Sequence, residues 1–130
     1  MEYKISIYDD DDYRKVIIFI DLEEVDLESL TPLFYLRNIR IKGFAQSNNK
    51  LTDDIKRYVE LFYIDSKNAT STLMAMYISS FTSNYDTSRL SLFILSRNSS
   101  QTMVECNKSM YPDQHIASYT RISEIINIYF

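Results

Sequence analysis

The sequence predicts an α/β fold, a three-layer sandwich with a mainly parallel central sheet of about five strands. Two apolar runs, Val16–Asp21 and Leu90–Ser96, are rich in aliphatic and aromatic residues, which is typical of strands buried on both faces. Strand-like and helix-like segments alternate, as parallel crossover connections require. At 130 residues the chain can bury one core, so we expect a single domain over residues 15–130. Residues 1–14 are expected to form an N-terminal arm or an extra edge strand.

The first half of the domain is expected to alternate between strands and helices. In chain order these elements are Val16–Asp21, Asp26–Leu36, Asn38–Phe44, Asp53–Tyr58 and Val59–Ile64. Within the first helix, Leu27, Leu30 and Phe34 share one face. Pro32 interrupts this helix, because proline cannot donate a backbone hydrogen bond. Ahead of the domain, Tyr3–Tyr8 alternates weakly, as an arm or edge strand would.

The second half continues the alternation to the end of the chain. Its elements are expected at Ala69–Phe81, Leu90–Ser96, Ser100–Lys108, His115–Tyr119 and a last helix with an apolar stripe at Ile122, Ile125, Ile126 and Tyr129. Asn68 is expected to cap the first of these helices, because its side chain can accept a bond from a free backbone N–H. The methionines at positions 74, 76, 103 and 110 are expected to fill gaps in the core.

Residue counts exclude several kinds of site. Cys106 is the only cysteine and His115 the only histidine, which excludes disulfide frameworks and zinc clusters. Gly43 is the only glycine, so glycine-rich phosphate loops and nucleophile elbows are absent. No run approaches the roughly 20 apolar residues of a membrane helix, and no apolar signal core follows the N-terminus. We therefore expect a cytoplasmic protein without a membrane partner.

Charge and composition bear on partners and source. The formal net charge is −4, and Asp9–Asp12 form an acidic run that is expected to be solvated. A negative chain attracts nucleic acid poorly, because phosphate binding depends on Lys and Arg. Basic clusters occur at Arg37–Lys42 and Lys56–Arg57 and are expected to form a solvated rim. Scarce Gly and Pro beside abundant Ile, Asn, Tyr and Ser suggest an A/T-rich genome, such as that of a virus, for which the expected location is the host cytoplasm.

Polar residues follow both buried runs. Asp21, Glu23 and Glu24 end or follow the first, and Arg97–Ser99 follow the second. Ligands of parallel sheets lie at the carboxyl ends of strands where the strand order reverses, so Asp21 is expected at the bottom of any cleft there. The site would be only half acidic. Alternatively, Asp21 is a strand-terminating or helix-capping carboxylate without metal, and Asn98 and Ser99 cap the next helix.

Four segments, in order, resemble the PIN-like and NYN ribonuclease domains. Ile17–Val25 is similar to the "IDxEN" opening of that family, and Gly43–Ala45 with Asn48–Lys50 to its second strand and loop. Lys67–Ser71 followed by Ala75–Ile78 resembles its "KNALD" and "AFYLG" segments, and Phe93–Asn98 resembles its "FIISKD" strand. The resemblance covers roughly residues 15 to 110. It implies a Rossmann-like, PIN-like fold and a metal-dependent RNA nuclease.

The resemblance carries over only part of the family's acidic site. That chemistry requires several carboxylates around one or two Mg²⁺ or Mn²⁺ ions. Asp21 and Glu23 keep their acids, whereas Glu24 stands where the family has Asn. Neutral residues stand at three further acidic positions of the family, Ser71, Asn98 and Thr102. Because Mg²⁺ is held largely by anionic charge, the remaining site would be weak.

Three functions follow in order of preference. The first is a catalytically degenerate domain, a pseudoenzyme that acts as a structural or protein-interaction module with a protein partner or a second copy, and without a cofactor. The second is a Mg- or Mn-dependent endoribonuclease with Asp21, Glu23 and Asp65 as metal ligands and Lys67 on the RNA. The third is a non-catalytic RNA-binding domain that uses the basic clusters and exposed tyrosines for stacking. The net charge predicts that RNA would bind only weakly.

Overall fold

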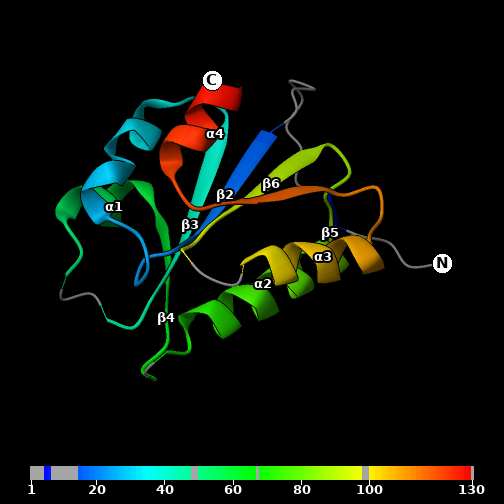
Figure 1. Ribbon diagram of the computed structural model, residues 1–130, viewed down its shortest axis with the longest axis horizontal. Helices are drawn as coiled ribbons and strands as arrows, with labels where there is room; N and C mark the ends of the chain where they lie inside the picture. The colour runs from blue at the N-terminus through cyan, green and yellow to red at the C-terminus, as the bar shows by residue number, and fades with distance from the viewer. Residues whose placement is uncertain (1–4, 7–14, 48–49, 67, 98–99, 130) are drawn as a thin grey trace.

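A five-stranded parallel sheet forms the centre of the protein, in the order β4–β3–β2–β6–β7 (Figure 1). The computed structural model describes residues 5–6, 15–47, 50–66, 68–97 and 100–129. The five strands are β2 (Lys15–Asp21), β3 (Ile39–Ala45), β4 (Glu60–Tyr63), β6 (Leu90–Leu95) and β7 (His115–Tyr119). Every pairing between them is parallel. The predicted α/β fold with a mainly parallel five-stranded sheet is therefore confirmed.

Helices cover both faces of this sheet (Figure 1). On one face lie η1 (Leu27–Tyr35), α1 (Asp53–Tyr58) and α4 (Ile122–Tyr129); on the other lie α2 (Thr70–Asn84) and α3 (Ser100–Met110). A hydrophobic core lies on each face of the sheet. Alternate residues of β2 pack into one core or the other, because side chains along a strand point to opposite faces. Ile18 and Ile20 join the η1 side, and Ile17 and Phe19 join the α2 side, all without exposed surface.

The strand order reverses between β2 and β6. From β2 the chain builds β3 and β4 outward on one side, and then it returns to place β6 and β7 on the other. The carboxyl ends of β2 and β6 therefore diverge into different connections and leave room for a ligand between them. No described helix is long and apolar enough to span a bilayer.

Two of the predicted helices differ from the observed ones, the first in its type and the second in its cap residue. The helix predicted at Asp26–Leu36 is a 3₁₀ helix that contains Pro32, with Asp26 as its cap. Asn68 does not cap α2, because it adopts a left-handed backbone with a φ of 61°, and Ala69 takes the cap position without a side-chain hydrogen bond. A further short pair, β1 (Ile5–Ser6) with β5 (Tyr85–Asp86), forms a separate parallel sheet.

The methionines divide between core and surface. Met74 is fully buried, as predicted, and Met103 packs against the same core. Met76 and Met110 do not fill the core, since each is 67% exposed. Both lie on the outer side of the α2–α3 layer, where no further element of the described chain covers them.

Candidate functional site

Asp21 ends β2 at the point where the strand order reverses, and its side chain has no exposed surface. Its Oδ1 accepts a hydrogen bond from Thr70 Oγ1 at 2.9 Å and another from the backbone N–H of Glu23 at 3.1 Å. Among the described residues its Oδ2 has no hydrogen-bond partner. Thr70 is the first residue of α2, so this carboxylate connects the end of the central strand to the start of a helix.

Burial raises the pKa of the Asp21 carboxyl above its ordinary value, because the charged form loses hydration. The hydrogen bonds from Thr70 and from the Glu23 backbone lower this pKa, and the nearby charges of Glu24 and Glu23 raise it. The net shift is upward. A carboxylate in this setting favours the protonated form more than an exposed aspartate does.

The two glutamates after β2 are engaged with neighbouring strands. Glu23 Oε1 accepts a hydrogen bond from the backbone N–H of Gln46, just beyond β3, at 2.7 Å. Glu24 Oε2 accepts one from Ser96 Oγ, just beyond β6, at 2.8 Å. Both carboxylates therefore hold the loop after β2 to the strands on either side of it.

The other predicted site residues lie in different places. Ser71 and Thr102 line a groove between α2 and α3, and Asp65 is exposed beyond the end of edge strand β4. Lys67 and Asn98 lie outside the described residues. Within the described ranges, no three or more His, Cys, Asp or Glu side chains are grouped to hold a metal ion, so Asp21, Glu23 and Asp65 form no such group.

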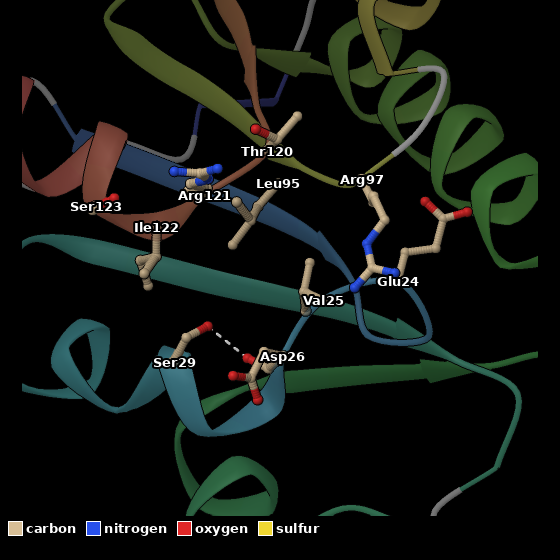
Figure 2. A pocket seen from close by; sticks show the side chains of 10 residues that line it. All are labelled: Glu24, Val25, Asp26, Ser29, Leu95, Arg97, Thr120, Arg121, Ile122 and Ser123. Carbon is tan, nitrogen blue, oxygen red and sulfur yellow. Dashed lines mark hydrogen bonds between the residues drawn. The ribbon is translucent and has the colours of Figure 1, made fainter.

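A cavity of about 620 Å³ opens at the same edge of the sheet, on the side of η1 and α4 (Figure 2). The loop after β2, the end of β6 and the first turn of α4 line it, with the residues Glu24, Val25, Asp26, Ser29, Leu95, Arg97, Thr120, Arg121, Ile122 and Ser123. Asp21 is not among them; it lies on the α2 side, against Thr70. In Figure 2 the side chains of Arg97 and Arg121 lie on either side of Leu95.

The acids of this cavity have hydrogen-bond partners within the fold, whereas its arginines have none in the part of the chain that the structure describes. Besides the bond from Ser96 to Glu24, the Asp26 carboxylate accepts from the backbone N–H of Glu28 at 3.2 Å and so caps η1. Among the described residues, neither the Arg97 nor the Arg121 side chain has a hydrogen-bond or ion-pair partner, and both are exposed. The formal charges of these two acids and two arginines cancel, and within the described chain the guanidinium groups are the charged groups of the cavity without a partner.

Sequence reasoning placed Asp21 at the end of β2, but its expected position at the bottom of the cleft is wrong, because Asp21 does not line this cavity. It also missed Thr70 and the position of Arg121. Thr70 is a polar residue at the start of a helix, and such residues often make hydrogen bonds there. The sequence instead predicted that Asn68 would be the polar residue that caps this helix. Arg121 follows the fifth strand of the sheet, and only the strand order brings it to the same edge as Arg97.

Comparison of the chain with protein-family models, with curated proteins and with solved structures gave no match. The chemistry available at the carboxyl edge comes from one buried carboxylate, two internally engaged glutamates and two free guanidinium groups. Such a set can bind and position a ligand. Within the described ranges it offers no group of three or more carboxylate, histidine or cysteine side chains that could hold a metal ion.

Proposed function

We propose that the protein is a catalytically inactive PIN-like domain that acts as a protein-interaction module. The observation that carries this proposal is the use of the acids that follow β2. Glu23 binds the backbone of Gln46 and Glu24 binds Ser96, so both stabilise the fold at the position where the resembling nucleases would hold metal.

The donor set at Asp21 does not fit the Mg²⁺ or Mn²⁺ that the family resemblance implies. Mg²⁺ retains several waters and needs anionic oxygens that are open to it. Asp21 Oδ2, which has no hydrogen-bond partner among the described residues, is sealed from solvent. The neighbouring hydroxyl of Thr70 is a neutral group that already donates to Oδ1. The residues around Asp21 are therefore not suited to hold a catalytic metal ion.

The outer face of α2 and α3 supports an interaction role. We call the hollow between these helices the methionine groove; its apolar lining residues are Ala75, Met76, Ile78, Met103, Cys106, Met110 and Tyr111. Its volume is about 450 Å³. Methionine is flexible and polarizable, and exposed methionines are typical of surfaces that adapt to a partner.

The charge distribution supports a second copy of the chain as the occupant of this groove. The chain carries a net charge of −4, so two copies repel each other over most of their surface. In contrast, α2 contains no charged residue, and α3 has one of each sign, Glu105 and Lys108. Two such faces can meet without like-charge repulsion, and a two-fold interface requires the same patch on both copies.

Two measurements test the proposal. Light scattering over a range of concentrations should give the mass of a dimer, and a strict monomer at all concentrations would overturn self-pairing. Separately, Mg²⁺ and Mn²⁺ are titrated into the protein by calorimetry, and a labelled single-stranded RNA is incubated with it. We expect neither binding nor cleavage. Metal binding and cleavage that are both lost in Asp21→Asn would overturn the inactive assignment.

The second candidate is the metal-dependent endoribonuclease, and one observation favours it. Asp21 is buried at the point where the strand order reverses, and its Oδ2 has no hydrogen-bond partner among the described residues. Its pKa is raised, and buried groups with raised pKa values are concentrated at functional sites. In that case the loop after β2 would have to move so that Oδ2 became accessible. The calorimetric comparison with Asp21→Asn decides between the two candidates.

A further inference from the structure

We infer that the cavity at the carboxyl edge of the sheet binds a small phosphate ester through Arg97 and Arg121. This inference goes beyond the proposed pairing of two copies and does not depend on it. The cavity lies on the η1 and α4 side of the sheet, and the methionine groove lies on the opposite side.

The position and size of the cavity are those of a ligand site. It is formed after β2, β6 and β7, at the carboxyl edge where parallel α/β sheets bind their ligands. Its volume of about 620 Å³ lies within the range of small-molecule sites, which is roughly 300 to 1,000 Å³. Val25, Leu95 and Ile122 supply apolar surface for the body of a ligand.

The arginines are the charged groups of the cavity that remain available to an anion. The Glu24 carboxylate accepts a hydrogen bond from Ser96, and the Asp26 carboxylate accepts one from the first turn of η1. In contrast, the Arg97 and Arg121 guanidinium groups have no partner among the described residues. Guanidinium groups bind phosphate oxygens through paired hydrogen bonds.

The first turn of α4 adds hydrogen-bonding groups on the same wall. Ser123 lines the cavity and has no hydrogen bond from its hydroxyl within the described chain. Thr120 also lines it, and its hydroxyl donates to Glu124 at 3.1 Å. The start of a helix favours a negative ligand, because backbone N–H groups there are free and the helix dipole is positive.

The surrounding acids select a small ligand over a polyanion. A chain of net charge −4 with Glu24 and Asp26 on the cavity wall repels a long run of phosphates more strongly than one phosphate group. A small phosphate ester can lie across Leu95, between the two arginines, with its apolar or aromatic body against Leu95 and Ile122.

Calorimetric titration of the full chain with adenosine 5′-monophosphate, adenosine and inorganic phosphate tests the inference. We expect the nucleotide to bind, adenosine not to bind and inorganic phosphate to bind more weakly. Arg97→Gln and Arg121→Gln should each weaken nucleotide binding by about tenfold or more, since each removes a charge-assisted contact. The matched control is Arg57→Gln on α1, an exposed arginine that lines none of the cavities described and removes the same charge.

Three results would overturn the inference. The first is no binding of either the nucleotide or inorganic phosphate. The second is an equal loss of affinity in Arg57→Gln, which would mean a general charge effect rather than a site. The third is binding of a single-stranded RNA without binding of the small phosphates. Unfolding temperatures of the three variants are measured in parallel, and amide chemical shifts at Thr120 and Ser123 that move on nucleotide addition would place the ligand in this cavity. Because light scattering reports pairing independently, failure here leaves the proposed function intact.

Discussion

The Thr70 hydroxyl donates a hydrogen bond to Asp21 Oδ1 across 2.9 Å, between two residues that are both buried. This bond joins the end of the central strand β2 to the first residue of α2. It lies beneath the edge of the sheet at which the strand order reverses. The start of α2 is therefore fixed by a tertiary contact, since its cap residue Ala69 contributes no side-chain hydrogen bond.

Replacing Thr70 by valine should destabilise the fold. The Thr70→Val variant keeps the shape of the side chain but leaves Asp21 with one fewer donor, which costs about 1–3 kcal/mol for a buried polar group. Because the Thr70 hydrogen bond lowers the pKa of Asp21, its loss should raise that pKa further. Urea unfolding measures the first effect and NMR titration of the carboxyl measures the second. Thr70→Ser keeps the hydroxyl, so an equal loss of stability in Thr70→Ser would contradict this role.

Replacing Asp21 by asparagine should stabilise the protein at neutral pH. The folded-state pKa of Asp21 is raised, so the folded state favours the protonated form, and stability falls as the pH rises from the unfolded-state pKa through the folded-state pKa. Asp21→Asn removes the charge and should therefore raise the free energy of unfolding at pH 7. The gain should disappear near pH 3, where both proteins are neutral at this position. Thermal unfolding from pH 3 to pH 7 measures it, and a variant that is less stable at every pH would refute the prediction.

The sheet could be predicted because its signals are local. In β2 and β6 nearly every residue is apolar, and the structure buries them on both faces. The helix α1 and the strand β7 have the predicted bounds, since Thr52 caps the helix and the apolar residues of β7 follow a turn. A strand that is buried on both faces appears in the sequence as a nearly continuous run of apolar residues.

Features that depend on contacts distant in sequence could not be predicted. Thr70 and Asp21 are 49 positions apart, and nothing local shows that they meet. The exposure of Met76 is of the same kind, because it depends on which side of α2 remains uncovered. Arg97 and Arg121 line one cavity only because β6 and β7 are neighbours.

Lys42 and Glu60 should respond unequally to substitution. Lys42 is buried, and its Nζ lies 2.5 Å from Glu60 Oε2 and 5.3–5.8 Å from the ring centres of Phe62, Tyr77 and Phe81. Burial lowers the pKa of Lys42, but the hydrogen bonds with Glu60 and Tyr77 outweigh this and raise it. The Lys42 charge therefore stabilises the fold below its unfolded-state pKa, and this contribution is lost only as an alkaline pH passes the folded-state pKa.

Removing the exposed partner should cost more than removing the buried one. Glu60→Gln leaves the Lys42 charge buried without its counter-ion and should cost about 2 kcal/mol. Lys42→Met leaves Glu60 in water, since that side chain is 59% exposed, and the thioether can contact the rings. We therefore expect Lys42→Met to cost less than about 1 kcal/mol. Chemical denaturation compares the two, and the reverse order would show that the cation–ring contacts dominate.

Gly43 should not tolerate a methyl group. A Cβ at this position in β3 would lie 2.7 Å from Leu22 Cδ1 and 2.8 Å from Val59 Cγ1, closer than van der Waals contact allows. Gly43→Ala should therefore cost about 1–3 kcal/mol through overpacking. Combining Gly43→Ala with Val59→Ala should recover part of this loss relative to the sum of the single changes. Strict additivity in a double-mutant cycle would place the strain elsewhere.

A charge placed in the methionine groove should separate two copies of the protein. Met76 is 67% exposed and lines the groove on the uncharged helix α2, so Met76→Lys would put two like charges on the paired faces. The expected result is a monomer by light scattering at concentrations at which the unmodified chain is a dimer. Ile128→Lys is the matched control, because Ile128 is 62% exposed on α4, which packs on the other face of the sheet.

The reactivity of Cys106 provides an independent test of whether the methionine groove is covered when two copies pair. It is the only cysteine, it is exposed, and it lines the groove. Its reaction with a thiol reagent should slow as the protein concentration rises and pairing covers it. In Met76→Lys the rate should stay at the fast, dilute value throughout. If the rate is independent of concentration in a protein that scatters as a dimer, the two copies meet through a different face, and the α2–α3 assignment fails while self-pairing stands.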